Sequence, residues 1–132
     1  MIIVNKNEFE KIINECKNVN IEKIYFAIGI IEKEIIKIIE IIECKNIAEN
    51  PIIEFKVDPL CLYKLFKYAE EKRLEIVALI HSHPILPYPS DIDIKNMKLW
   101  RIPWIIINYK NGNTKAWVLK NDKIKEIHIL KI

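Results

Sequence analysis

The sequence predicts an α/β domain in which a mixed β-sheet is flanked by about three helices. Apolar runs rich in β-branched and aromatic residues alternate along the chain with segments of helical periodicity. Asp58-Pro59 is a helix-start signal, because a capping carboxylate precedes a proline at the first helical position. The chain has 132 residues, of which 51% are hydrophobic and 30% charged, so it is large enough for one core. We therefore expect a single domain over residues 1–132.

Each element is predicted from its local pattern. Helices are assigned where apolar residues recur every three or four positions, and strands where short apolar runs are rich in β-branched residues. Gly29, inside one such run, marks a bend or a close backbone approach. In chain order we expect a strand at 2–4, a helix from a cap at Asn5 or Asn7 to about 17, strands at 24–31 and 35–42 that form a hairpin, a loop at 45–51, a strand at 52–57, a helix from 59 to about 72, a strand at 75–80, a helix from 90 to about 100, and strands at 103–108, 114–119 and 124–130.

Two turns and three tryptophans complete this outline. Asn111-Gly112 is the residue pair favoured in two-residue hairpin turns, and Asn121-Asp122 is expected to join the last two strands. Large aromatic side chains are usually buried, so the tryptophans are interpreted as core or sheet-packing residues. They are Trp100, Trp104 and Trp117.

Composition excludes several classes of function. The net charge of +3 is small, and no basic cluster with interleaved aromatic residues indicates a nucleic-acid partner. The apolar runs are too short to span a bilayer, so no membrane partner is expected. The N-terminal residues lack the order of a signal peptide, and we expect a cytoplasmic location.

The three cysteines are odd in number and widely spaced. Cys16, Cys44 and Cys61 form no C-x-x-C pair, which argues against a cysteine zinc cage. Free cysteines behave as small core residues, so we expect free and partly buried thiols.

Two imidazoles, a hydroxyl and two carboxylates gather around one proline-rich loop. His81-Ser82-His83-Pro84 ends an apolar run, and the loop that follows closes on Ser90-Asp91-Ile92-Asp93. Side chains two residues apart on an extended chain point the same way, so His81 and His83 can face one divalent metal ion. A catalytic zinc needs three protein ligands, and Asp93 is the candidate for the third.

Simpler explanations exist for each part of this pattern. Ser90-x-x-Asp93 also fits a capping box, and taken alone that explanation is favoured over metal binding, although Glu or Gln is the usual partner there. A lone H-x-H is likewise more often ordinary histidine than ligand. The combination of both motifs favours a metal site. A hydrolase would also need a general base, and the pattern alone does not choose among the eighteen acidic residues.

The motifs resemble those of the JAMM (MPN+) metalloprotease family. That family combines an upstream glutamate with H-[ST]-H-P and S-x-x-D, and its glutamate begins a strand of the form E-x-x-G-L-L-x-G. Here Glu22 and Gly29 keep the spacing of seven, although Tyr25 replaces the first glycine. Phe55-x-x-Asp58 leading into a helix is also similar, and the likeness spans about Glu22 to Ile107. Six residues rather than the usual seven separate His83 from Ser90, which indicates a shortened loop in which Ser90 and Asp93 keep their roles.

The resemblance implies a cytidine-deaminase-like fold and a role for each site residue. His81, His83 and Asp93 would hold Zn²⁺, with water as the fourth ligand. Glu22 would act as the general base and pass a proton to the leaving amine. Ser90 would donate a hydrogen bond to the oxyanion, a kind of contact that contributes about 3 kcal/mol.

The function implied is a zinc metallopeptidase of the isopeptidase type. It would cleave a ubiquitin-like or small β-grasp modifier at its C-terminal Gly-Gly junction with a lysine, and its tail could add as a strand to a sheet edge. Trimming of a sulfur-carrier protein at its C-terminus is a close variant, and a monomer or homodimer is expected. The alternative is a catalytically inactive scaffold or interaction domain of the same fold.

Overall fold

The computed structural model describes every residue of the chain except residue 85. The described residues form eight strands and three helices. Their bounds are β1 Ile2–Val4, α1 Lys6–Lys17, β2 Ile24–Glu32, β3 Ile35–Cys44, α2 Pro59–Glu71, β4 Glu75–His83, α3 Asp91–Leu99, β5 Trp104–Asn108, β6 Thr114–Lys120, β7 Lys123–Ile127 and β8 Ile129–Lys131. Among these residues, no helix is both long enough and apolar enough to cross a bilayer.

All strands belong to one mixed sheet, as the sequence predicts. The strand order is β7-β6-β5-β4-β2-β3-β1-β8. β4 and β5 are parallel, as are β1 with β3 and β1 with β8, whereas β2 pairs antiparallel with β3 and β4. The central strands are the most buried, which explains why they read as continuous apolar runs.

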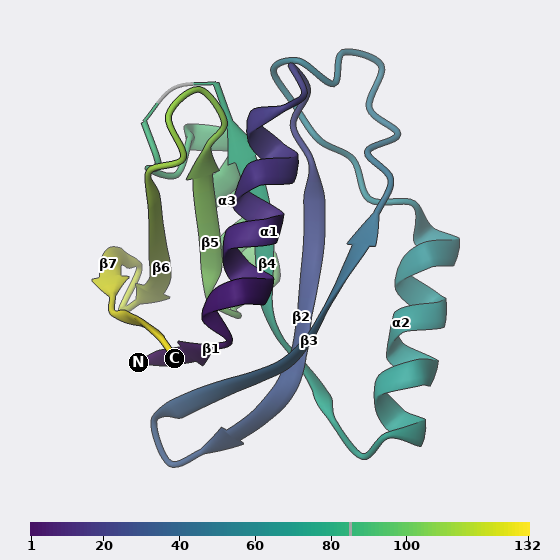
Figure 1. Cartoon of the computed structure of the whole chain (residues 1–132), viewed down its shortest axis with the longest axis vertical. Coiled ribbons are helices and arrows are strands. Elements are labelled where there is room, and N and C mark those ends of the chain that lie inside the picture. Colours follow the sequence, from purple (N-terminus) through teal and green to yellow (C-terminus); the bar gives the residue numbers. More distant parts are fainter. Residues whose placement is uncertain (85) are drawn as a thin grey trace.

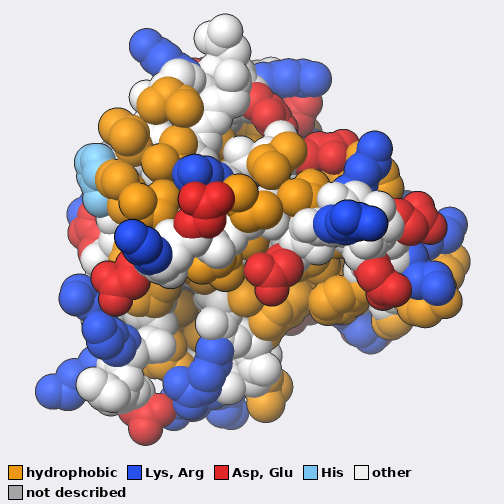
Figure 2. All heavy atoms as spheres, turned by 90° about the horizontal axis from the view of Figure 1, so that it is seen from below, with side chains coloured by type: hydrophobic (Ala, Val, Ile, Leu, Met, Phe, Trp, Pro, Cys, Tyr) orange, Lys and Arg blue, Asp and Glu red, His pale blue; other side chains and the backbone are white. Residues whose placement is uncertain are grey.

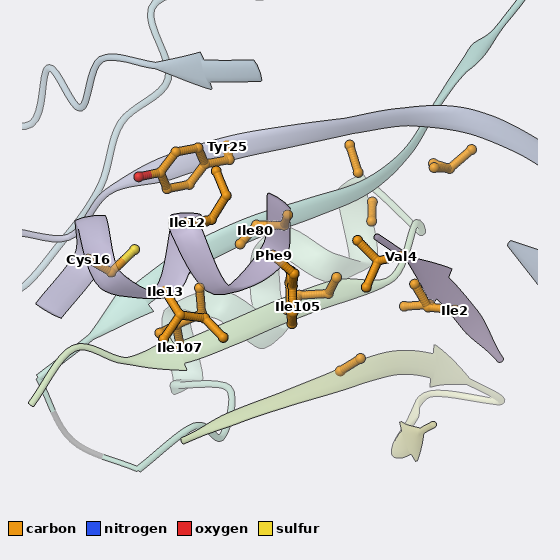
Figure 3. Close-up of a cluster of buried hydrophobic side chains, with 14 of the residues drawn as sticks. Ile2, Val4, Phe9, Ile12, Ile13, Cys16, Tyr25, Ile80, Ile105 and Ile107 are labelled. Atoms are coloured by element: carbon orange, nitrogen blue, oxygen red, sulfur yellow. The ribbon is translucent and has the colours of Figure 1, made fainter. Parts of the chain in front are cut away.

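One face of the sheet is covered by α1 (Figure 1). Asn5 caps this helix by accepting a hydrogen bond from the N–H of Glu8 at 2.9 Å. Its apolar stripe of Phe9, Ile12, Ile13 and Cys16 is buried against the sheet. Figure 3 shows these side chains facing the strand residues Tyr25, Ile80, Ile105 and Ile107.

The opposite face is covered by α2 and α3. Asp58 caps α2 as predicted, and Leu65, Ala69 and Met97 bring the two helices into a second apolar cluster. The tryptophans lie in or against this cluster, which confirms their interpretation. Trp104 and Trp117 are buried, and Trp100 packs on Phe26 with ring centroids 5.2 Å apart.

The last segment of the chain reaches both edges of the sheet. β7 pairs with β6, and after His128 the chain continues as β8, which pairs with β1. The N–H of Ile2 donates to the carbonyl of His128 at 2.8 Å. The single strand predicted at 124–130 is therefore two short strands, because its two halves pair with opposite ends of the sheet.

Two further local predictions are wrong. Residues 52–57 form no strand, and only an isolated bridge joins Val57 to Asn46. The side chain of Asn46 takes the place of a neighbouring strand, since it bonds the main chain of Glu54 and Lys56. The hairpin between β5 and β6 has a five-residue loop over 109–113, in which Gly112 has a positive φ of 82° and Asn111 does not.

Gly29 has the role predicted for it. A bulge interrupts the pairing of β2 with β3 between Ile28 and Gly29. A Cβ atom at Gly29 would overlap the backbone carbonyl of Lys37, so glycine is required by the close approach of the two strands.

The expectation of free cysteines holds for one residue of the three. Cys16, on the buried face of α1, is free. Cys44, at the end of β3, and Cys61, in the first turn of α2, form a disulfide with their Cα atoms 6.0 Å apart. The second apolar cluster packs α2 against the sheet, and this packing brings together two thiols that are distant in sequence.

On the face shown in Figure 2, side chains of both charges surround hydrophobic ones.

Candidate metal centre

Three separate parts of the chain meet at one end of the central strands. His81 and His83 lie at the end of β4, Glu22 lies just before β2, and Asp93 lies in the first turn of α3. The register of β2 and β4 pairs Ile24 with His81, which brings Glu22 beside the histidines. The structure thus assembles four of the five residues predicted for the site into one buried cluster, and the fifth, Ser90, caps the helix that carries Asp93.

The two histidines point to the face covered by α2 and α3. Alternation along β4 places His81 and His83 on this face and Ser82 on the other. Their ring centroids are 4.5 Å apart, and the ring of Phe55 lies 4.5 Å from that of His81. His81 is fully buried, and within the described structure neither of its ring nitrogens makes a hydrogen bond. Buried polar atoms normally have partners, so these nitrogens are suited to a ligand.

Asp93 serves both as a helix cap and as a neighbour of the imidazoles. The capping box is complete, because Asp93 N–H donates to Ser90 Oγ at 3.1 Å and Ser90 N–H donates to Asp93 Oδ2 at 3.0 Å. The same Oδ2 lies 2.9 Å from Nε2 of His83 and 3.4 Å from Nε2 of His81. The two explanations that the sequence leaves open are therefore compatible.

The Glu22 carboxylate approaches the histidines from the side of β2. Its Oε1 lies 3.4 Å from Nδ1 of His81, and the residue is 4% exposed. Glu22, His81 and His83 each offer a ligand atom, and these atoms lie within 4.8 Å of one another. Two imidazoles with two carboxylates at this spacing fit zinc, which takes nitrogen and oxygen ligands.

The electrostatics of the cluster favour the charged forms of His81 and Asp93. Burial opposes a charged His81, but the carboxylates of Asp93 and Glu22 outweigh it and raise the pKa of His81 to about 9. Burial also opposes a charged Asp93, yet the neighbouring imidazoles of His81 and His83 hold its pKa well below the usual range. A bound cation would replace the protons in this role, because it neutralises the same two carboxylates.

The shortened loop is anchored by the sheet. Trp117 of β6 donates through Nε1 to the carbonyl of Pro87 at 2.8 Å, and the ring of Tyr88 packs edge-on against Trp117 at 4.8 Å. These contacts explain how a loop with one residue fewer still delivers Asp93 to the histidines. Residue 85, within this loop, lies outside the described residues.

A groove leads from the cluster along α3. Its first part has a volume of about 200 Å³ and is lined by Glu22, His83 and Asp93, together with the exposed Ser90. Its second part, of about 320 Å³, lies between Val57 and α3. Both parts share Phe55 and Asn96, so the groove is continuous between the segment at 53–57 and the helix.

Sequence patterns did not single out two residues that shape the site. The Asn46 side chain donates to the carbonyls of Glu22 and Glu54. The Ser82 hydroxyl accepts from the N–H of Lys23, next to Glu22. The signal for Asn46 is an asparagine in a loop, where its side chain commonly bonds nearby backbone. Ser82 belongs to the His81-Ser82-His83-Pro84 motif, but the motif does not indicate what its side chain bonds.

Comparison with known proteins agrees with this geometry. Residues 9–120 match a family described as prokaryotic homologs of the JAB domain. The chain belongs to this family. The resemblance to the JAMM (MPN+) proteases that the motifs indicate is thereby confirmed.

Two relatives of this JAB-family protein are named for cleavage. It is 41% identical over 83 residues to the desampylase of Pyrococcus furiosus, in an alignment that covers 61% of this chain and 59% of the relative. It is 37% identical over 80 residues to the "Probable TtuB-protein conjugate cleaving protease" of Thermus thermophilus, covering 60% of this chain and 52% of the relative. The alignments thus span between half and three fifths of these relatives.

Solved structures confirm the fold. The solution structure of a Desulfitobacterium hafniense protein superposes on this JAB-family chain with a TM-score of 0.87 and 20% identity. The match covers all of this chain and 93% of the other chain. A Salinibacter ruber protein matches with a TM-score of 0.73 and 17% identity, over 92% of its chain. At such identities the likeness shows the α/β fold alone.

Proposed function

We propose that this protein is a zinc-dependent peptidase that cleaves a small β-grasp modifier at its C-terminal Gly-Gly junction. The observation that carries the proposal is the contact of Asp93 Oδ2 with both buried imidazoles, next to the Glu22 carboxylate and at one end of a groove. The names of the two relatives support cleavage of protein conjugates as the reaction.

Three residues would hold the zinc. Asp93 Oδ2 already faces Nε2 of both His81 and His83, and a catalytic zinc keeps three protein ligands and one open position. Glu22 is close enough to bind an ion as well, but it approaches the other nitrogen of His81. We therefore assign Glu22 to acid–base chemistry. When bound, zinc supplies Lewis acidity, which makes water nucleophilic near neutral pH and polarises a carbonyl.

Glu22 and Ser90 would provide the remaining chemistry. Glu22 would accept a proton from the attacking water and donate it to the amine that leaves. The Ser90 hydroxyl accepts a hydrogen bond from Asp93 N–H, so its own proton is free to be donated to the oxyanion. The cap therefore fixes the position of a donor that substrate can reach.

The groove provides room for an extended tail. Within the described structure, neither the N–H nor the carbonyl of Phe55 makes a hydrogen bond, although both neighbouring residues bond Asn46. A peptide that runs along this segment could pair with Phe55 as an added strand. Its last carbonyl would then lie near Ser90 and the metal ligands. Glycine fits such a place because it lets backbone approach closely.

The test uses zinc-loaded protein and a Gly-Gly-ended β-grasp modifier joined by an isopeptide bond to a fluorescent lysine. We expect one zinc per chain by elemental analysis and release of the labelled lysine. Glu22→Gln should keep the zinc and lose cleavage. The same modifier with a linear C-terminal extension would separate isopeptide cleavage from processing of a sulfur carrier. A protein that takes up no zinc on reconstitution would support the inactive scaffold instead.

A further inference from the structure

The segment that carries Glu22 is held by hydrogen bonds from the loop at 46–51 and from Ser82 of β4. Glu22 N–H donates to the carbonyl of Pro51 at 2.6 Å, and the Glu22 carbonyl accepts from Asn46 Nδ2 at 2.7 Å. Lys23 N–H donates to Ser82 Oγ at 2.8 Å, and the Lys23 carbonyl accepts from Ser82 N–H at 3.1 Å. All four main-chain polar groups of the two residues therefore have partners, and side chains supply two of these.

The Glu22 side chain does not fix its own position. Among the described residues no hydrogen bond holds its carboxylate, whose Oε1 lies 3.4 Å from Nδ1 of His81. Where the carboxylate lies thus depends on the backbone that bears it.

Ser82 holds this backbone from β4. It is fully buried and points to the face opposite the histidines between which it stands. Its hydroxyl accepts from Lys23 N–H and can donate to the carbonyl of Ile21 at 3.5 Å, so it bonds the residues on both sides of Glu22. One hydroxyl group thus bonds both neighbours of Glu22 to β4.

Asn46 holds the same backbone from the other side and links it to the groove. Its Nδ2 donates to the carbonyls of Glu22, at 2.7 Å, and Glu54, at 2.9 Å. Its Oδ1 accepts from the N–H groups of Ala48 and Lys56, both at 3.0 Å. One amide thereby joins the Glu22 segment to the segment that forms the groove wall.

We propose that Ser82 and Asn46 are positioning residues that hold the Glu22 carboxylate at the metal centre, and that Asn46 also holds the groove wall. This inference rests on the proposed function. It predicts that the two residues differ in their kinetic effects. Ser82 acts on the Glu22 segment alone and affects kcat, whereas Asn46 affects both kcat and KM.

Three variants test the proposal with the fluorescent-lysine conjugate. Ser82→Ala should lower kcat by ~10- to 100-fold with KM unchanged, because small displacements of catalytic groups have effects of this size. Ser82→Thr keeps the hydroxyl and should restore most of the wild-type kcat. Asn46→Asp exchanges the donor for a repelling oxygen and should lower kcat and raise KM. Asn50→Asp, an equal change of charge at an exposed position in the same loop, is the control.

A readout independent of activity is amide hydrogen exchange in the zinc-loaded protein. Exchange at Lys23 should quicken in Ser82→Ala but not in Ser82→Thr, while each variant keeps one zinc per chain. Wild-type kcat and unchanged Lys23 exchange in Ser82→Ala would overturn the proposal, as would a Ser82→Thr protein as impaired as Ser82→Ala. If the wild type itself cleaves nothing, the proposed function fails, and the exchange measurement alone then decides the positioning roles.

Discussion

Oδ2 of Asp93 lies 2.9 Å from Nε2 of His83, although the loop between the two residues is one residue shorter than in the family pattern. The contact survives because Trp117 anchors the loop at Pro87 and because the capping box orients Asp93 at the start of α3. The local structure of the helix therefore determines the position of the proposed metal ligand.

Removing this carboxylate should remove the metal. We expect Asp93→Asn to weaken zinc binding by at least about 100-fold, beyond the effect usual for groups that only support a ligand. Asp91→Asn, in the same turn but exposed, should bind zinc as the wild type does. Competition with a fluorescent chelator measures both affinities. Equal affinities would assign the third ligand to Glu22 instead.

Ser90 should affect catalysis and stability separately. Both alanine and glycine at position 90 remove the hydroxyl. Loss of the cap in Ser90→Ala should lower the free energy of unfolding by about 1 kcal/mol, whereas Ser90→Gly should lower it by only a few tenths of a kcal/mol. Both Ser90→Ala and Ser90→Gly should therefore lose about 10²- to 10³-fold in kcat, with Ser90→Gly nearly as stable as the wild type. Urea unfolding and conjugate cleavage are measured on the same samples. A Ser90→Gly protein with normal kcat would show that the hydroxyl only caps the helix.

The Cys44–Cys61 disulfide should be detectable in the number of reactive thiols and in the free energy of unfolding. Without reductant, the unfolded chain should show one reactive thiol, and with reductant three. The folded protein should show none at about pH 8, because burial raises the pKa of Cys16 to about 11. Replacing both Cys44 and Cys61 by serine should lower the free energy of unfolding by about 3 kcal/mol, as expected for a loop of this length. Three thiols without reductant would contradict the pairing.

The metal-free protein should lose stability as pH rises. The folded pKa of His81 is raised, so its stabilising contacts are fully present below its unfolded pKa of about 6.5 and are lost as pH rises through about 9. The Asp93 pKa is lowered, so its contribution is present above its ordinary pKa and is lost at acid pH. The midpoint of urea unfolding of chelator-treated protein should therefore fall between about pH 6 and about pH 10.

The zinc-loaded protein provides the comparison. Zinc binds neutral imidazole, so its contribution to stability should grow over the same interval. His81→Gln without zinc should flatten the dependence on pH. A metal-free midpoint that rises with pH would show that His81 is neutral in the fold.

Local patterns predicted most of the fold and much of the site. The caps at Asp58 and Ser90 were predicted, and Asn5 was one of two residues proposed to cap the first helix, because a capping side chain bonds backbone close to it in sequence. The convergence of His81 and His83 follows from strand periodicity alone. Glu22 did not follow from pattern, because its position depends on the register of β2 with β4, and only the family resemblance pointed to it.

The errors also have physical causes. Residues 52–57 have strand composition, but Asn46 bonds this segment where a strand would, so tertiary context overrides propensity. Pairing of Cys44 with Cys61 depends on the packing of α2 against the sheet, and spacing alone does not fix such connectivity. Asn111-Gly112 has the composition of a tight turn, yet only the glycine adopts a positive φ.

The ends of the sheet bear on how the protein avoids self-association. β7 and β8, the two outermost strands, have five and three residues, and they are consecutive parts of one chain segment. Edges this short are poor templates for aggregation. Phe55, whose backbone makes no hydrogen bond within the described structure, lies away from these edges and beside the proposed metal ligands. An extended peptide could thus pair with the protein at the proposed site of cleavage, whereas the short outer strands offer copies of the folded protein little backbone with which to pair.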